Sequence, residues 1–232
     1  MSTDDYMEKK IVVDYSDTAV FKGARVFFPF LNEGVEYIKR HGIKDVCVWQ
    51  GMERSRHTVD FGFFEELGFI ERLDWLVPLS KKSSIDGLYS LKKLISLRWA
   101  ADSDIEIDFS KLETLETLAM NYRNGFKNLG KLSNLKKLHT QSVKTDDLKF
   151  LSDLKELRSL RIIRGRFKSL EGLEQCESLE ELMLQHCFSL VHAESTLHKL
   201  ENLKSVLIQG CKKHDIGDMA ELKSKIAHVW IG

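Results

Sequence analysis

One spacing of apolar side chains recurs seven times between Leu67 and Ile208. Each copy places apolar residues at a start position and then three, six, nine and eleven residues later, as in Leu173, Cys176, Leu179, Leu182 and Leu184. The copies start at Leu67, Leu88, Phe109, Leu129, Leu151, Leu173 and Leu197. Of these 35 positions only Pro78 and Thr140 are not apolar, in a chain that is 43% hydrophobic. A period of this length restricts the chain to a repetitive fold.

The spacing within one copy predicts both a strand and a turn. The last two apolar positions are separated by a single residue, which is strand periodicity with one buried face. The earlier steps of three suit a short 3-10 or distorted helical segment. A helical bundle is disfavoured, because steps of three, three, three and two do not stay on one face of a 3.6-residue helix. We therefore expect an α/β solenoid, with a parallel sheet on its concave face and short helical or irregular turns on its convex face.

The repeat core is written in this sequence as "LETLAM", "LRSLRI" and "LEELML". These segments resemble the L-x-x-L-x-L core of the leucine-rich repeat (LRR) family. The regular units of 21 or 22 residues are similar to those of internalins and of the phosphatase-binding regulatory family. The resemblance implies the solenoid fold and a protein-binding role, because members of this family are nearly always binding proteins with varied partners.

The first part of the chain is less regular. Residues 1–66 are predicted to form an N-terminal cap with degenerate repeats, continuous with a solenoid over 67–232 in one structural domain. Within the cap we expect a strand at Ile11–Tyr15 and a helix over Leu31–His41, with Asn32 able to cap the helix start.

The array extends beyond the seven copies. Strand halves at Val46–Val48 and Val229–Ile231 indicate closer to nine repeats. The chain then ends at Gly232, so we expect the last edge to be blunted by charge, by a short strand or by a partner. The two prolines and the lack of a Ser/Gly or acidic run favour one continuous domain.

Composition excludes several classes of partner. Lys plus Arg number 35 and Asp plus Glu number 35, which argues against a general nucleic-acid or membrane-surface binder. No segment approaches the roughly 18 apolar residues of a membrane span, and the N-terminus does not read as a secretory signal. The cysteines include Cys176 in an apolar repeat position, with Cys187 and Cys211 where the family commonly places Asn or Cys. We expect reduced, buried thiols and a cytoplasmic protein.

Catalytic and cofactor motifs are not found. The eight histidines show no paired metal-ligand spacing, and there is no nucleophile elbow, phosphate-binding loop or dinucleotide fingerprint. The sequence thus predicts a protein that is not an enzyme and that holds no cofactor and no metal.

The candidate site is the concave face of the sheet. Positions eight, ten and twelve after each start should face outward there, with a basic middle and apolar ends, the latter at Trp75, Val77 and Leu79 and again at Met183, Leu207 and Trp230. Such a mixture is typical of a protein interface, although a merely solvated sheet face is the alternative. The predicted protein-binding residues are Trp75, Arg98, Asn121, Tyr122, His139, Gln141, Arg161, Ile163, Arg164, Met183, Gln185, Leu207 and Trp230.

These observations predict a non-enzymatic protein-binding scaffold that sequesters or inhibits one partner through its concave face. The basic middle favours a partner with an acidic patch, while nucleic acid is a lesser possibility and a membrane is not expected. The short single-domain layout is similar to that of bacterial immunity proteins, which neutralise a cognate toxin. The alternatives are an adaptor or regulatory subunit that bridges proteins and, less favoured, an enzyme with an unrecognised site.

Overall fold

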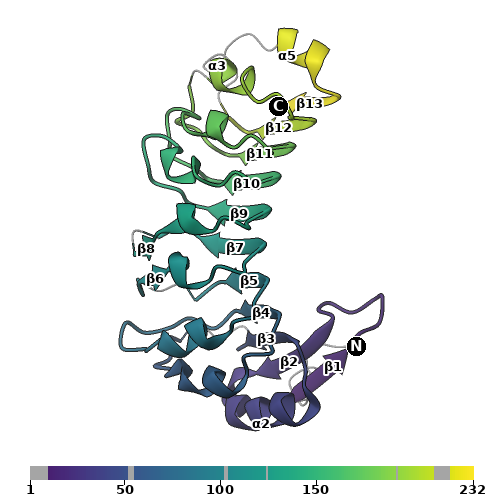
Figure 1. The fold of residues 1–232 in the computed structure, drawn as a ribbon, viewed down its shortest axis with the longest axis vertical. Helices are drawn as coiled ribbons and strands as arrows, with labels where there is room; N and C mark the ends of the chain where they lie inside the picture. Colours follow the sequence, from purple (N-terminus) through teal and green to yellow (C-terminus); the bar gives the residue numbers. More distant parts are fainter. Residues whose placement is uncertain (1–9, 52–54, 102–103, 124, 192, 212–219) are drawn as a thin grey trace. The chain divides into compact units, whose positions relative to one another are not determined.

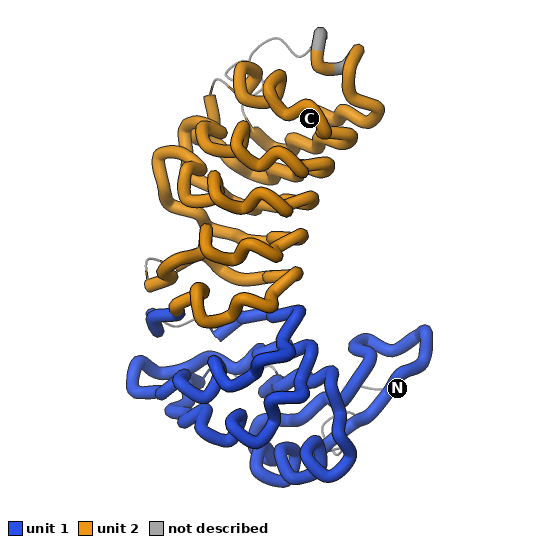
Figure 2. The backbone as a smooth tube through the Cα atoms, in the orientation of Figure 1, with its two compact units in different colours: residues 1–107 blue, residues 108–232 orange. Residues whose placement is uncertain are grey.

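The structure is a computed structural model that describes residues 10–51, 55–101, 104–123, 125–191, 193–211 and 220–232. It divides into two compact units, unit 1 over Met1–Ile107 and unit 2 over Asp108–Gly232 (Figure 2). The expectation of a cap that ends at residue 66 within one structural domain stays a prediction.

Unit 1 contains short strands separated by helical turns. Its elements are β1 (Ile11–Asp14), β2 (Gly23–Phe27), the 3-10 helix η1 (Phe28–Phe30), α2 (Leu31–His41), β3 (Asp45–Trp49), η2 (Phe61–Glu66), β4 (Arg72–Trp75), η3 (Asp86–Ser90) and β5 (Ser96–Trp99). The short strand β6 (Ile107–Asp108) spans the boundary with unit 2.

Sheet order in unit 1 follows chain order. Strand β1 pairs with β2 in antiparallel fashion, and β2, β3, β4 and β5 then pair in parallel.

The predicted helix over Leu31–His41 is confirmed, and it ends at Gly42 in the left-handed conformation that glycine tolerates. The prediction that Asn32 caps the start of this helix is wrong, because the N-cap residue is Phe30 and it makes no side-chain capping hydrogen bond.

Strand β4 corrects the frame of the first repeat. Its Leu73 pairs with Leu97 and its Trp75 with Trp99, so Leu73 and Trp75 occupy the strand positions that the sequence assigned to later residues. The repeat therefore starts at Phe64 rather than Leu67, and its five apolar positions are all buried. The frame was ambiguous because a pattern with steps of three matches itself after a shift of three. Only the closing step of two separates the two frames.

Unit 2 repeats the same unit more regularly. Its elements are η4 (Phe109–Lys111), β7 (Thr117–Asn121), β8 (Phe126–Lys127), η5 (Leu129–Lys131), β9 (Lys137–Gln141), η6 (Lys149–Leu151), β10 (Ser159–Ile163), η7 (Leu173–Gln175), β11 (Glu181–Gln185), α3 (Glu194–Leu197), β12 (Ser205–Gln209), α5 (Ala220–Lys225) and β13 (His228–Ile231).

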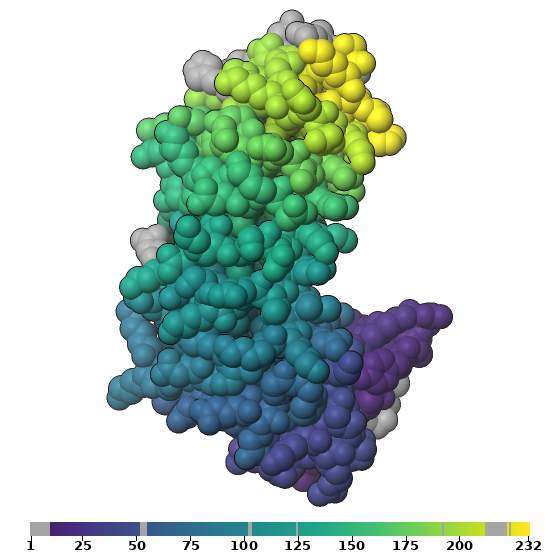
Figure 3. Space-filling view, viewed as in Figure 1, coloured from purple at the N-terminus to yellow at the C-terminus, as the bar shows by residue number. Residues whose placement is uncertain are grey.

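The sheet of unit 2 is wholly parallel. Strands β7, β9, β10, β11, β12 and β13 lie side by side in chain order (Figure 1), and the sequence colours of Figure 3 follow the same order. Between β7 and β12 each strand buries its second and fourth residues and leaves the others at least partly exposed. One sheet face therefore belongs to the core, whereas the other is open.

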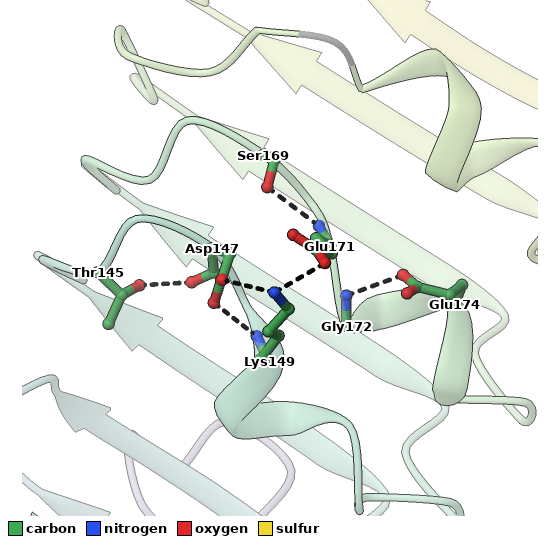
Figure 4. Close-up of polar contacts among 7 residues, drawn as sticks. All are labelled: Thr145, Asp147, Lys149, Ser169, Glu171, Gly172 and Glu174. Atoms are coloured by element: carbon green, nitrogen blue, oxygen red, sulfur yellow. Dashed lines mark hydrogen bonds and ion pairs between the residues drawn. The ribbon is translucent and has the colours of Figure 1, made fainter.

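Polar contacts tie the turns of neighbouring repeats together. The Lys149 ammonium lies 2.7 Å from the Glu171 carboxylate and 3.4 Å from that of Asp147 (Figure 4). The Asp147 carboxylate also accepts the backbone N–H of Lys149 at 3.1 Å, and the Glu174 carboxylate accepts that of Gly172 at 2.8 Å. These contacts satisfy backbone donors at the starts of η6 and η7, which is a structural role.

All four cysteines are buried and free, as the sequence predicts. Burial raises the pKa of Cys47 and of Cys176 to about 11, which keeps both thiols protonated. The thiols of Cys187 and Cys211, from neighbouring repeats, share a hydrogen bond that raises the pKa of Cys187 and lowers that of Cys211.

Candidate functional site

A row of outward-facing residues crosses the open face of unit 2. The parallel register aligns the middle residues of successive strands, so that neighbours in the row lie one strand spacing apart, about 4.8 Å. We call this row the central row; it consists of Ala119, His139, Arg161, Met183, Leu207 and Trp230. The register predicted from the repeat spacing is therefore confirmed for unit 2.

A chain of hydrogen bonds holds the cationic part of this row. Arg161 donates to Oε1 of Gln185 from Nε at 3.1 Å and from Nη2 at 2.7 Å. Gln185 in turn donates from Nε2 to Oε1 of Gln209 at 2.8 Å. Because both bonds to Arg161 fall on the oxygen of the Gln185 amide, its nitrogen is left to reach the next strand. The guanidinium is thus fixed over the sheet.

A second amide contact lies two strands away. Gln141 donates from its side-chain nitrogen to the side-chain oxygen of Asn121. Ile163 occupies the same strand position between Gln141 and Gln185, so it separates the two amide pairs. The predicted residues Asn121, Gln141, Ile163 and Gln185 therefore share one line beside the central row.

The residues that follow three of these strands have left-handed backbone. Ser142, Arg164 and His186 have φ of 60°, 57° and 56°, and Gly210 has 61° at the same repeat position. The N–H groups of Arg164 and His186 reach the next strand at Gln185 O and Gln209 O, both 2.7 Å. A residue with a Cβ costs roughly 1–2 kcal/mol in this conformation. The exposed Arg164 and His186 side chains thus stand at a strained edge of the open face, and such strain often marks functional positions.

The other end of the central row is apolar. Met183 and Leu207 are half-buried, and Trp230 on the last strand is 49% exposed. Since the three are aligned in register, they form a continuous apolar strip next to Arg161. The open face of unit 2 therefore changes from cationic to apolar along the direction of the repeats.

Tyr122 does not join this row. It packs against Phe150 of η6 with ring centroids 5.2 Å apart, and burial raises its pKa. The two rings line a cavity of about 300 Å³, together with Lys131, Lys149 and Asp153 on the turn side of unit 2. The structure thus separates Tyr122 from the other predicted residues of this unit.

The prediction that Trp75 is an exposed binding residue is wrong. Trp75 is fully buried, and its indole N–H donates to the carbonyl of Val77 at 2.9 Å. Val77 and Leu79, expected beside it on the face, are fully buried as well. The cause is the frame shift described above, which turns Trp75 to the core side of β4, while Val77 and Leu79 lie beyond the end of the strand.

The frame shift also hid Asp74 of β4, which lies on the same sheet face as Arg98. The register aligns Arg25, Cys47, Asp74 and Arg98 across β2, β3, β4 and β5. Only Arg98 was predicted. The start at Phe64 would have revealed Asp74, because it gives a fully apolar set of five and removes Pro78 from a strand position.

The described residues contain no group of three or more His, Cys, Asp or Glu side chains that could hold a metal ion. Within the same residues, no helix has the length and apolar character needed to cross a membrane.

Comparison with known proteins identifies the architecture. No family model and no curated protein sequence matches the chain. Among solved structures, internalin C2 of Listeria monocytogenes has a TM-score of 0.53 and 17% identity, with 79% of each chain covered. The chain has the leucine-rich repeat fold.

Other solved LRR proteins are similar to a comparable degree. The internalin inlF of Listeria monocytogenes gives a TM-score of 0.52 and 14% identity over 81% of this chain and 67% of its own. The LRR protein LIC12759 of Leptospira interrogans gives 0.50 and 14% over 79% of this chain and 55% of its own. At these identities the likeness establishes the LRR fold and its parallel repeats.

Proposed function

We propose that this LRR protein is a non-enzymatic scaffold that binds another protein through the open face of unit 2. The observation that carries the proposal is the central row, where a fixed guanidinium at Arg161 adjoins the apolar strip of Met183, Leu207 and Trp230. Arg, Trp and Met are enriched in interface cores. An arginine already held in place loses less side-chain entropy when a partner binds.

The partner's chemistry follows from the same row. Arg161 and Arg164 favour a partner surface with acidic groups opposite the cationic end and apolar groups opposite the strip. Glu181, which accepts a hydrogen bond from Ser159 at 3.0 Å, supplies one negative charge at the border between the two. Encounter with such a partner should be steered electrostatically and should weaken as salt is added.

The role we favour is sequestration or inhibition of one protein, as bacterial immunity proteins do with a cognate toxin. The four unpaired cysteines support action in a reducing compartment such as the cytoplasm. The second candidate is an adaptor that bridges two proteins, and it is favoured by the separate arginine-rich surface of unit 1 described below.

The proposal can be tested with a double variant. Tagged wild type and Arg161→Glu/Met183→Asp are used to capture partners from a lysate, and the captured protein is then purified for titration. We expect the double variant to bind at least tenfold more weakly, since it reverses the fixed charge and adds a charge to the apolar strip. Equal affinity of the double variant and wild type for the partner would show that the open face of unit 2 is not the binding surface.

Two controls separate binding from other effects. Lys155→Glu makes the same charge change as Arg161→Glu, but on an exposed turn residue whose ammonium bonds Gln175 O, and it should bind as wild type does. Turnover of a substrate by the purified protein in a broad activity screen would contradict the non-enzymatic part of the proposal.

A further inference from the structure

Unit 1 carries its own outward-facing cluster of arginines. The parallel register places four residues side by side on neighbouring strands: Arg25, Cys47, Asp74 and Arg98. Arg72 lies two positions before Asp74 on β4, so its side chain is on the same face of the sheet. The arrangement is built from the described strands β2 to β5 alone, so it does not depend on unit 2.

A buried carboxylate organises two of these arginines. The side chain of Asp74 is 6% exposed, and its oxygens lie 3.5 Å from Arg72 Nε and 3.9 Å from Arg98 Nη1. The side chains of Arg72 and Arg98 are 40% and 59% exposed. The ion pairs use one nitrogen of each guanidinium, which has five N–H donors. The negative charge is thus covered while the positive charges face outward.

An aromatic platform adjoins the arginines. The Arg25 guanidinium lies over the Trp49 ring at 5.1 Å, and the Phe27 and Trp49 ring centroids are 5.2 Å apart. The Arg72 guanidinium lies over the Phe21 ring at 4.3 Å. Stacking of this kind holds a guanidinium flat and leaves its edge able to meet a carboxylate in a bidentate manner.

We propose that this surface, formed by Arg25, Trp49, Arg72 and Arg98, is a second binding site that takes an acidic protein segment. Asp45 on β3 is the register partner of Arg72, whose charge acts on its carboxylate. Three arginines therefore face two carboxylates, those of Asp74 and Asp45, which leaves one positive charge in excess. Asp74 is covered and Asp45 is partly buried, so the exposed part of the surface carries more positive than negative charge. A segment rich in Glu or Asp, with an aromatic or apolar residue for the Trp49 platform, complements it.

Charge also decides against nucleic acid. Tight binding of a phosphate backbone requires many cations along a track, because its strength grows with the number of phosphates neutralised. This surface has a single excess charge and a carboxylate at its centre. Separate carboxylates, each bound by one arginine guanidinium, complement this surface better than a phosphate backbone does.

The test uses defined probes rather than an unknown partner. A labelled Glu-rich peptide, its Gln-substituted counterpart and a single-stranded oligothymidylate are titrated against the whole chain at low and at physiological salt. We expect the Glu-rich peptide to bind most tightly. Arg98→Gln should weaken that binding about tenfold, the effect of one charge-assisted hydrogen bond. The affinity of Arg98→Lys should lie between those of wild type and Arg98→Gln, because lysine keeps the positive charge but lacks the planar guanidinium that bonds both carboxylate oxygens.

A matched control and a local readout complete the design. Lys92→Gln removes the same charge from an exposed turn residue of unit 1 and should leave affinity unchanged. With 5-fluorotryptophan in all four tryptophan positions, the ¹⁹F resonance of Trp49 should shift on adding the Glu-rich peptide, and that of Trp230 should not.

Three results would overturn the proposal: an unmoved Trp49 resonance, equal binding of the Gln-substituted peptide, or preferred binding of the oligothymidylate. A shift of Trp230 in place of Trp49 would assign the acidic peptide to the open face of unit 2. The second site would then be wrong, while the function proposed for unit 2 would stand.

Discussion

Arg161 and Gln185 are joined by two hydrogen bonds that end on the same oxygen, from Nε at 3.1 Å and from Nη2 at 2.7 Å. Their strands β10 and β11 are neighbours, and Gln185 lies two residues beyond the partner of Arg161 in the register. The guanidinium therefore leans along the strand direction and is held before any partner arrives.

Removing the Gln185 side chain should release Arg161. In Gln185→Ala we expect the Arg161 Nε–H resonance to exchange faster with water and the free energy of unfolding to fall by about 1 kcal/mol, the usual worth of such bonds at a half-exposed site. NMR and urea denaturation measure the two effects. Gln141→Ala breaks an amide contact with Asn121 and should leave the Arg161 resonance unchanged. An unaltered resonance in Gln185→Ala would contradict the positioning role.

Thr140 is a buried polar residue within an apolar position of the repeat. Its side chain is fully buried on β9, and its hydroxyl oxygen has no hydrogen-bond partner among the described residues. Thr140→Val replaces the hydroxyl with a methyl of similar shape, so we expect the free energy of unfolding to rise by about 1 kcal/mol. Thr140→Ser keeps the hydroxyl, loses the methyl and should destabilise. Chemical denaturation of both variants checks the pair, and a less stable Thr140→Val would show that the hydroxyl is satisfied.

Two glycines with positive φ differ in the space around them. At Gly172, with φ of 104°, a Cβ would lie 2.5 Å from Lys149 Cα and 2.7 Å from Lys149 N, which are backbone atoms of the neighbouring repeat (Figure 4). At Gly42, with φ of 60°, nothing lies within 4 Å of that Cβ.

Alanine at these positions should therefore have unequal effects. Gly42→Ala is expected to cost roughly 1–2 kcal/mol from backbone strain alone. Gly172→Ala adds a clash that the backbone must relieve by moving, so its loss of stability should be clearly larger. Thermal or urea unfolding of the two variants provides the measurement. Equal losses would mean that neighbouring repeats do not pack this closely at η7.

Asp74 and Asp108 should respond to pH in opposite ways. Burial raises the pKa of Asp74 above its ordinary 3.8 despite Arg72 and Arg98. Because the folded-state pKa of Asp74 is raised, its favourable contribution to the free energy of unfolding is fully present below pH 3.8. That contribution is lost as the pH rises through the folded-state pKa. Asp74→Asn should therefore be more stable than wild type at pH 7, with a difference that shrinks as the pH falls.

Asp108 provides the control of opposite sign. Hydrogen bonds from Ser110 and Asn128 lower the pKa of Asp108. Its favourable contribution to the free energy of unfolding is therefore present above pH 3.8 and is lost as the pH falls through the folded-state pKa. Asp108→Asn should be less stable than wild type at pH 7 and approach it in acid. Unfolding curves between about pH 3 and pH 7 test both variants. If Asp74→Asn is the less stable protein at pH 7, attraction by the arginines outweighs burial.

Most of the fold was predictable because it depends on spacing. Apolar residues at fixed intervals must share one face, and the period of the repeat requires stacking. The helix over Leu31–His41 and the strand of Val46–Val48 were predictable from local periodicity. The frame of the first repeat was not, since steps of three look alike after a shift of three, and this error placed Trp75 on the wrong side.

The candidate site divides in a similar way. The sequence by itself determined which side chains of unit 2 point outward from the open face of the sheet, because the alternation of side chains along a strand follows from backbone geometry. Only the tertiary structure decided that Arg161 is held by Gln185, that Tyr122 turns to Phe150, and that Arg72 and Arg98 share the buried Asp74. Those contacts join residues that are more than twenty positions apart or depend on burial by neighbouring strands. Spacing along the chain fixes which face a side chain occupies, whereas its partners on that face depend on rotamers and on the next repeat.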